Sequence, residues 1–316
     1  MPHPHTHAGR RLGLSLVLTL AFAAAEAVAG FWAHSLALLS DAGHNLADAL
    51  ALSWYGVRMA RKPADARRTF GYHRVGILTA LGNGLTLVVI AAVIAVEAYR
   101  RFAHPQPVQP AIMVAAGLLA IAVNLYIGWG LSRSAHANLN ARAAALHVFG
   151  DVGASAGVIL GALIIALTGA AWVDPLVSVL IATLIALGAL RLIGEAANIL
   201  LESTPRDVSL SDLVRDMLRV PGVHDVHDLH VWTISSGMLA LSCHAVIDDL
   251  PPSDSAPILD RITEMLRRDY TISHSTVQFE SEVHTSHEGC ACQPETCERL
   301  YCDLRLPDSE HEHAHP

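Results

Sequence analysis

The sequence predicts a helical membrane domain of six spans, followed by a small water-facing α+β domain. Of its 316 residues, 52% are hydrophobic and only 16% are charged, whereas a soluble domain usually carries about 25% charged residues. Long apolar runs fill residues 12–200, and residues 201–316 have the mixed composition of a soluble protein. We therefore expect an all-α six-helix bundle joined to a ferredoxin-like domain of element order α-β-β-α-β.

Charge and cysteine content narrow the class of protein. The net charge of −8 argues against a nucleic-acid partner, which favours a basic face. Four of the five cysteines lie within 290–302, and on the cytosolic side such crowding predicts metal binding rather than disulfides. No small-residue cleavage site follows the first apolar segment, so we expect no cleavable signal peptide.

Six segments are long enough to cross about 30 Å of hydrocarbon at about 1.5 Å per residue. The second and fifth are the least uniformly apolar, as expected for helices buried inside a bundle. The six expected spans are 12–32, 36–59, 75–99, 110–132, 142–168 and 172–199.

The distribution of basic residues predicts the orientation of these spans. Segment 58–74 carries seven basic residues, one of them a histidine, whereas 33–35 and 169–171 contain no Lys or Arg. Arg100 and Arg101 lie on the opposite side but are outnumbered. The positive-inside rule then places both termini in the cytoplasm, as an even number of spans requires.

Two His-x-x-x-Asp pairs lie in the second and fifth spans: His44 with Asp48, and His147 with Asp151. Residues i and i+4 share a helix face and differ in height by about 6 Å. Because the two spans run antiparallel, the expected depths match crosswise, with His44 level with Asp151 and Asp48 level with His147. Two nitrogen and two oxygen ligands suit a tetrahedral Zn²⁺.

A purely structural interpretation competes with this one, since a single membrane histidine often only hydrogen-bonds a neighbouring helix. An Asp at the bilayer centre, however, costs about 2.5–3.5 kcal/mol and tends to mark a functional path, so two matched pairs favour a site. Asp41 is a candidate for a supporting or helix-entry role. For the other polar residues of the spans we expect hydrogen bonds between helices: Asn45, Asn83, Glu97 and Asn124.

Four features of the first 200 residues occur together: "SLALLSDAGHNLADALAL" at 35–52, "FGYHRVGILTALGNG" at 70–84, the His147/Asp151 pair and "WVDPLVSVLIA" at 172–182. They resemble the cation diffusion facilitator family, and most closely its zinc-transporting branch, which includes the bacterial cobalt–zinc–cadmium resistance exporters. The resemblance covers about residues 10–285. It implies a homodimeric, proton-coupled Zn²⁺ exporter in the bacterial inner membrane, with a cytosolic metal-binding domain.

The resemblance implies that His44, Asp48, His147 and Asp151 form the transport site, with the first histidine typical of members that favour zinc over cadmium. Cd²⁺ and Co²⁺ remain further candidate cargoes. Some relatives bind another metal between spans two and three through an Asp and two His. Here the matching positions are Asp65, Arg68 and Tyr72, with His73 displaced by one, and we expect no metal there.

Proton coupling would follow from competition, because metal and protons bind the same imidazole and carboxylate atoms. A histidine titrates near pH 6.5 and small shifts move it across the working range. The sequence contains no "GxxxxGK[ST]" phosphate loop, so we expect no ATP hydrolysis. Its apolar spans, residues 12–200, contain no "HExxH" motif either, which argues against a zinc protease that acts within the membrane.

In the C-terminal part we expect a helix over 209–220, capped by Ser209 or Ser211. Two strands then form a hairpin that turns at 235–237, and a helix over about 255–269 precedes a strand, "ISHSTVQFES". The expected domains are a tail at 1–11, the membrane domain at 12–200, the cytosolic domain at 201–285 and a Cys/His-rich tail at 286–316.

Three histidines fall in 224–230, and alternation along a strand predicts that they do not share one face. The family resemblance implies His227, His244 and Glu280 as cytosolic metal ligands, and Cys290 and Cys292 as further ones. The N-terminal His3, His5 and His7 are candidates to complete a site on the neighbouring subunit. The tails also fit a solvated segment that binds metal weakly.

Two other functions remain open at this point. A membrane-anchored zinc sensor or storage protein would use the cytosolic ligands alone, but an anchor needs no histidine or aspartate inside its spans. A membrane hydrolase would need an open coordination position on its zinc, and four protein ligands leave little room for one.

Overall fold

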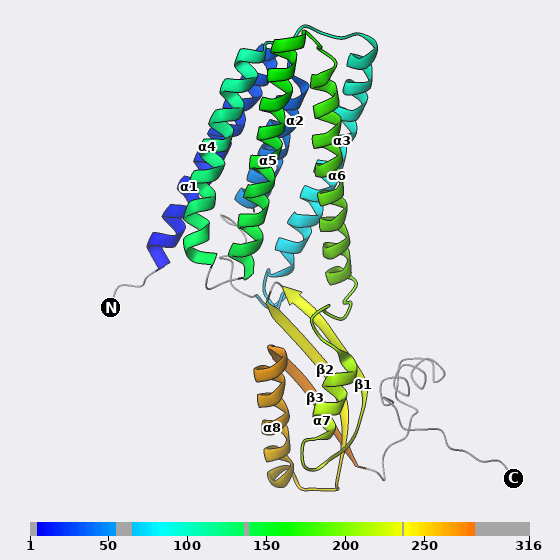
Figure 1. The fold of residues 1–316 in the computed structure, drawn as a ribbon. Helices are drawn as coiled ribbons and strands as arrows, with labels where there is room; N and C mark the ends of the chain where they lie inside the picture. The colour runs from blue at the N-terminus through cyan, green and yellow to red at the C-terminus, as the bar shows by residue number, and fades with distance from the viewer. Residues whose placement is uncertain (1–4, 55–64, 136–138, 236, 282–316) are drawn as a thin grey trace, which may run out of the picture. The chain divides into compact units, whose positions relative to one another are not determined.

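A computed structural model describes residues 5–54, 65–135, 139–235 and 237–281. The chain divides into two compact units, Met1–Ala196 and Ala197–Pro316, and each is described by itself. In the described part of the first unit, helices follow one another and no strand intervenes (Figure 1). They are α1 (His5–Ala33), α2 (Leu36–Trp54), α3 (Arg74–Ala103), α4 (Pro110–Ala135), α5 (Leu139–Thr168) and α6 (Val173–Leu200).

Four helical stretches in the described residues are long and apolar enough to cross a membrane: Arg74–Ala103, Pro110–Trp129, Val148–Thr168 and Val173–Leu200. Thr19–Ala33 of α1 is apolar but shorter. Large apolar side chains cover the outside of these helices, and Leu167 is 86% and Leu184 67% exposed. Such surfaces are stable only against lipid or another apolar partner.

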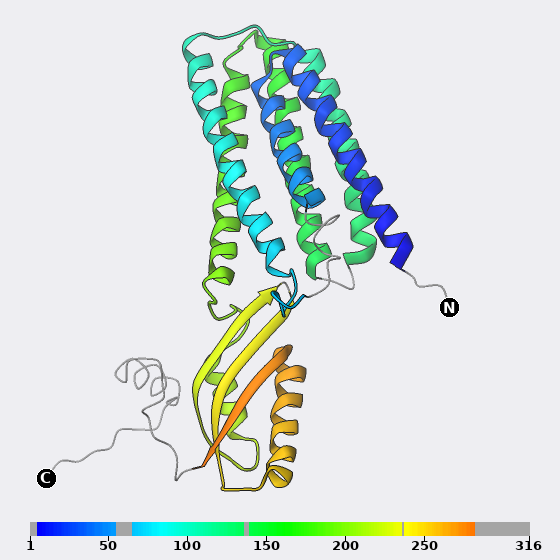
Figure 2. The same cartoon turned by 180° about the vertical axis from the view of Figure 1, so that it is seen from behind.

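Small residues set how closely the helices pack. A Cβ atom on Gly117 of α4 would lie 2.6 Å from Ile159 of α5, and one on Gly84 of α3 would lie 2.8 Å from Ile193 of α6. Helix α1 packs against α2 and α4, and both views of the ribbon show α3 beside α6 (Figure 2). Close approach at glycine is typical of helix pairs in membranes.

Asp174, the second residue of α6, caps the start of α2. Its carboxylate accepts hydrogen bonds from the Ser35 hydroxyl at 2.6 Å, the Leu36 N–H at 2.8 Å and the Ala37 N–H at 3.4 Å. The Arg101 guanidinium of α3 lies 3.7 Å from the same carboxylate. One buried side chain therefore satisfies the free N–H groups of α2 and joins three helices.

The second unit contains α7 (Leu210–Leu218), β1 (Val223–Ser235), β2 (Met238–Ile247), α8 (Pro252–Tyr270) and β3 (Ile272–Ser281). The sheet has the order β1-β2-β3, with β1 antiparallel and β3 parallel to β2. The expected cap is confirmed at Ser209, whose hydroxyl accepts from the Asp212 N–H. Helix α8 begins at Pro252, three residues before the predicted start, because Pro is well tolerated in a first turn.

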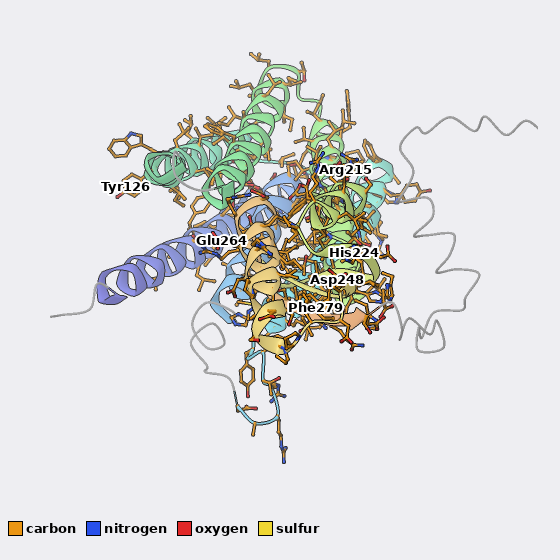
Figure 3. All side chains as sticks on the ribbon, turned by 90° about the horizontal axis from the view of Figure 1, so that it is seen from below. Tyr126, Arg215, His224, Asp248, Glu264 and Phe279 are labelled. Atoms are coloured by element: carbon orange, nitrogen blue, oxygen red, sulfur yellow. The ribbon has the colours of Figure 1, made fainter. Side chains whose placement is uncertain are left out.

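Both helices lie over one face of this sheet. In Figure 1 they lie in front of the strands, and Figure 2 shows the sheet from its other side. Leu213 of α7, Ile262 of α8 and Leu241 of β2 are fully buried in the shared core. Figure 3 shows Arg215 on α7 and Glu264 on α8, together with the neighbouring His224 and Asp248.

Strand β1 is irregular at three places, with register shifts between Val223 and Asp225, between His227 and His230, and between Thr233 and Ser235. Asp228 in the second shift has a φ of 50°, a left-handed conformation uncommon outside glycine. Simple alternation predicts opposite faces for His227 and His230. The inserted residue instead turns both of them away from the core, as expected for a bulge.

Candidate metal centres

Helices α2 and α5 bring a histidine and two aspartates together inside the first unit. His44 Nε2 lies 3.7 Å from Asp48 Oδ2 and 3.7 Å from Asp151 Oδ1. The side chains of His44 and Asp151 are 13% and 11% exposed. Burial of two carboxylates beside one imidazole is costly unless a cation or protons compensate the charge.

A cavity of about 380 Å³ contains this cluster. Its polar lining comes from α2, α3 and α5, and its apolar lining includes Ile181, Leu184 and Ile185 of α6. The polar residues are Asp41, His44, Asp48, Asn83 and Asp151. A cavity with carboxylates at its centre and apolar walls can admit a small hydrated cation.

His147, the fourth predicted ligand, lies in α5 one turn before Asp151, but its side chain is outside the described residues. Asn83 of α3, predicted only as a helix-to-helix donor, gives its Nδ2 hydrogen to Asp48 Oδ1 at 2.6 Å. It therefore fixes the orientation of one carboxylate in the cluster, as groups behind metal ligands commonly do.

Two buried acidic residues, Glu26 and Asp41, form a second polar group, and the sequence predicted a supporting role for Asp41 but none for Glu26. Glu26 of α1 is 3% exposed, and its Oε2 accepts a hydrogen bond from Asn45 Nδ2 at 3.2 Å. Asp41 is 1% exposed and accepts from the Ser155 hydroxyl at 3.3 Å. Glu26 is the sole acidic residue of the first apolar segment, a signal that could have identified it.

The second unit holds another cluster, built on the sheet face opposite the core. His227, His244 and Glu280 offer one ligand atom each, and these atoms lie within 4.8 Å of one another. His227 Nε2 lies 3.2 Å from Glu280 Oε2, and His244 Nδ1 lies 2.8 Å from Glu280 Oε1. Two imidazoles and a carboxylate are suitable ligands for Zn²⁺.

The far nitrogen of each imidazole faces an aspartate. His227 Nδ1 lies 3.8 Å from Asp225, and His244 Nε2 lies 3.8 Å from Asp228. Asp228 also lies 3.1 Å from His230 Nε2. A carboxylate behind a histidine ligand fixes the ring and makes the ligand nitrogen more basic, so these residues fit a metal.

The other predicted ligands contribute less to what the structure describes. Cys290, Cys292 and His3 lie outside the described residues, and His5 and His7 lie in α1 without described side chains. Cys243 is buried in the domain core, and this burial raises the pKa of its thiol to about 12. A thiol held protonated in this way is a poor metal ligand.

The loop before α3 holds a compact hydrogen-bonded group. Asp65 accepts from the Tyr72 hydroxyl at 2.7 Å and from the Arg68 N–H at 2.9 Å. The hydrogen bond from Tyr72 holds the pKa of the Asp65 carboxyl below its usual range. The Arg68 guanidinium lies 4.8 Å from the centre of the Tyr72 ring, and its charge disfavours a cation at this position.

Comparison with known proteins adds two family models that together cover most of the chain. Residues 12–201 match the model described as the cation efflux transmembrane domain. Residues 205–282 match the model described as the cation efflux protein, cytoplasmic domain.

Several curated proteins are similar along nearly their whole length. A protein of Bacillus velezensis named "Cadmium, cobalt and zinc/H(+)-K(+) antiporter" is 38% identical over 305 residues, which are 94% of this chain and 97% of that protein. The "Zinc transporter ZitB" of Pectobacterium atrosepticum is 40% identical over 323 residues, 99% of each chain.

A solved structure is also similar, the "Metal-bound C-terminal domain of the CzcD transporter from Cuprividus metallidurans". It is 36% identical and covers 23% of this chain and 99% of that chain, with a TM-score of 0.22.

Proposed function

The chain belongs to the cation efflux family, the cation diffusion facilitators, and on that premise we propose that it exports Zn²⁺ from the cytoplasm in exchange for protons. Cd²⁺ and Co²⁺ are further candidate cargoes, because relatives with 38% identity are named for all three metals. The family is one of transporters, and the proposed cycle includes no covalent chemistry.

The position of His44 between two aspartates carries this proposal. One imidazole nitrogen has a carboxylate oxygen on each side at 3.7 Å, in a cavity lined by α2, α3, α5 and α6. Zn²⁺ binds nitrogen and oxygen ligands at about 2.0–2.2 Å, so modest side-chain movement would let all three reach one ion. With His147 the set becomes two nitrogens and two oxygens.

Coupling to protons follows from the chemistry of these ligands. The ion needs a neutral imidazole and ionised carboxylates, so each bound proton removes a ligand. When the cavity faces the cytoplasm, the deprotonated cluster takes up Zn²⁺. When it faces the other side, protons displace the ion and the protonated cluster returns, which makes transport an exchange.

We further propose that α1 to α6 all cross the membrane, with both termini in the cytoplasm. Six crossings return the chain to its starting side, and they put the basic segment 58–74 on the cytoplasmic side with the termini. The name of a relative places potassium in the exchange as well, and the described residues give no reason to assign it here.

For the second unit we propose a cytosolic Zn²⁺ site formed by His227, His244 and Glu280, in a homodimer. Each ligand comes from a different strand, so a bound ion would neutralise the Glu280 carboxylate and link β1, β2 and β3 on the sheet face that the helices do not cover. A membrane-anchored sensor or storage protein would use this site alone, and it offers no role for the intramembrane cluster. The cluster at His44 therefore favours transport.

The direct test is exchange in proteoliposomes. Purified protein is reconstituted into vesicles with a pH-sensitive dye and a zinc-sensitive dye inside. With an inside-acidic pH gradient, external Zn²⁺ is expected to enter while the lumen loses protons. Entry without any proton movement would refute exchange, and binding without entry would favour the sensor.

The cytosolic site gives a separate prediction. Changing His244 to alanine is expected to remove one of the zinc ions bound per chain, since the remaining two ligands do not complete a site. Zinc bound by the full-length protein is measured by equilibrium dialysis and metal analysis. His274→Ala, on the neighbouring strand β3, is the control and should leave the count unchanged. An unchanged count in His244→Ala would exclude this site.

A further inference from the structure

Glu26 is buried in α1 with only part of its hydrogen-bonding capacity used. Oε2 accepts from Asn45, but the buried Oε1 accepts no hydrogen bond from any residue that the structure describes. A buried, unpaired carboxylate oxygen is unfavourable by several kcal/mol at most sites. A protonated Glu26 removes this problem, because the acid gains an O–H that can donate.

The acceptor for that O–H is Asp41. The two carboxyl groups are within hydrogen-bonding reach of each other, and they are 3% and 1% exposed. Carboxylate oxygens only accept, so a hydrogen bond between two carboxyl groups requires one proton between them. The hydroxyl of Ser155 donates to Asp41 and favours ionisation of Asp41, which leaves the proton on Glu26.

The charges around this pair also favour one bound proton. Asp151 of α5 faces both carboxyl groups and adds negative charge, and His44 of α2 faces Asp41. In α4, the other helix packed against α1, the titratable residue with a placed side chain in the described part is Tyr126, which is 69% exposed on the outside of the bundle. Two ionised carboxylates at such close distance repel each other strongly in a site away from water, as in the paired aspartates of acid proteases.

We propose that Glu26 and Asp41 form a proton-binding site, separate from the metal ligands, that holds one shared proton and releases it when a divalent cation enters the neighbouring cavity. The proposal rests on the transport function proposed above. It assigns to α1, which contributes no ligand to the cluster around His44, a direct part in the exchange of metal for protons.

Asp41 connects the two sites, since it belongs to the carboxyl pair and also lines the cavity around His44, Asp48 and Asp151. A doubly charged cation in this cavity stabilises the ionised form of both carboxyl groups. The O–H bond of Glu26 then breaks and its electron pair remains on the Glu26 carboxylate. The proton passes along the hydrogen bond to Asp41, which lines the cavity, and from Asp41 to water. Protonation of the pair from the other side reverses the step and weakens metal binding.

The decisive measurement is the number of protons released for each Zn²⁺ bound by the full-length protein in detergent, from calorimetry in buffers of different ionisation enthalpy. Glu26→Gln is expected to release about one proton fewer per ion at the membrane site than the unaltered protein. Asp41→Asn should lose the same proton. The double variant should lose no more than either single one, because the proton is shared. A matched control is Glu195→Gln, an exposed glutamate of α6 paired with Arg191, which should change nothing.

Unchanged proton release in Glu26→Gln with metal still bound would overturn the proposal, as would a double variant that loses two protons. Asp151→Ala separates this outcome from a failure of the proposed function. If Asp151→Ala leaves zinc binding intact, the membrane transport site itself is wrong. If it removes that binding, adding Glu26→Gln to it should have no further effect on proton release.

Infrared difference spectroscopy of the unaltered protein gives a second readout that needs no variant. Addition of Zn²⁺ near neutral pH is expected to remove a carboxylic-acid carbonyl band. Absence of this loss would contradict the proposal even if neither variant could be purified.

Discussion

Replacing Asp151 with alanine is expected to abolish zinc exchange in proteoliposomes. The change removes one of the two carboxylates that face His44 at 3.7 Å, and with it a ligand and a negative charge. Loss of a group behind a metal ligand alone costs about 10–100-fold in affinity, so loss of a ligand should lower the rate by about a hundredfold or more. Uptake of radioactive zinc under a pH gradient measures this, and Asp48→Ala should behave alike.

The control for this experiment is Glu195→Ala, whose side chain is 47% exposed near the end of α6. It should transport at the normal rate. Both proteins are compared by size-exclusion chromatography, because a loss of flux identifies the site only if Asp151→Ala still inserts and forms the same oligomer. Normal flux in both aspartate variants would remove the intramembrane cluster as the transport site.

The sequence predicted the main elements of this cluster because a charged residue inside an apolar span is rare and therefore informative. The family resemblance carried by the motifs around His44 and Asp151 is confirmed by both family models. Helical periodicity predicted that His44 and Asp48 share one face of α2, as their 3.7 Å separation shows; the same prediction for α5 depends on His147, whose side chain lies outside the described residues. Periodicity could not predict the role of Asn83, because an amide in a helix can donate to any neighbour that tertiary packing supplies.

Two other features escaped prediction for reasons of geometry. The role of Glu26 depends on the contact of α1 with Asp41 and Asn45, which only helix packing reveals. In β1, alternation failed because bulges insert residues at 224 and near Asp228, and strict alternation of side chains does not predict a bulge. His227 and His230 consequently point to the same side, although their spacing on a regular strand would separate them.

Arg101 shows that tertiary contacts also limit a prediction of membrane orientation from the number of basic residues on each side. Its position opposed the predicted orientation, yet the residue is not a free cation at the membrane surface. Its guanidinium donates to the His34 carbonyl at 2.5 Å and lies 3.7 Å from Asp174 and 3.3 Å from Glu97. A charge neutralised in such a cluster has less influence on orientation than one exposed to lipid headgroups.

Changing Asp174 to alanine is expected to produce the largest loss of stability of any substitution considered. Asp174 is 1% exposed. Its removal takes the buried carboxylate away from Arg101, which keeps the partly exposed Glu97, and it frees the Ser35 hydroxyl and two N–H groups of α2. Breaking a buried ion pair from one side costs about 3–5 kcal/mol, and loss of a helix cap costs about 1 kcal/mol. Thermal unfolding of the detergent-solubilised protein, followed by tryptophan fluorescence, should show a much lower midpoint.

Two variants locate the source of this loss. Glu97→Gln weakens a partly exposed ion pair with the same Arg101 and should cost about 1 kcal/mol or less. Asp174→Asn combined with Arg101→Gln removes both charges and keeps oxygen acceptors near the start of α2, so it should be less destabilising than Asp174→Ala alone. If the double variant is instead less stable than Asp174→Ala, the loss comes from the missing ion pair between Asp174 and Arg101. It then does not come from the charge of Arg101 that remains after Asp174 is removed. An unchanged midpoint in Asp174→Ala would mean that packing at Gly30 and Ala33 suffices to hold this end of the bundle together.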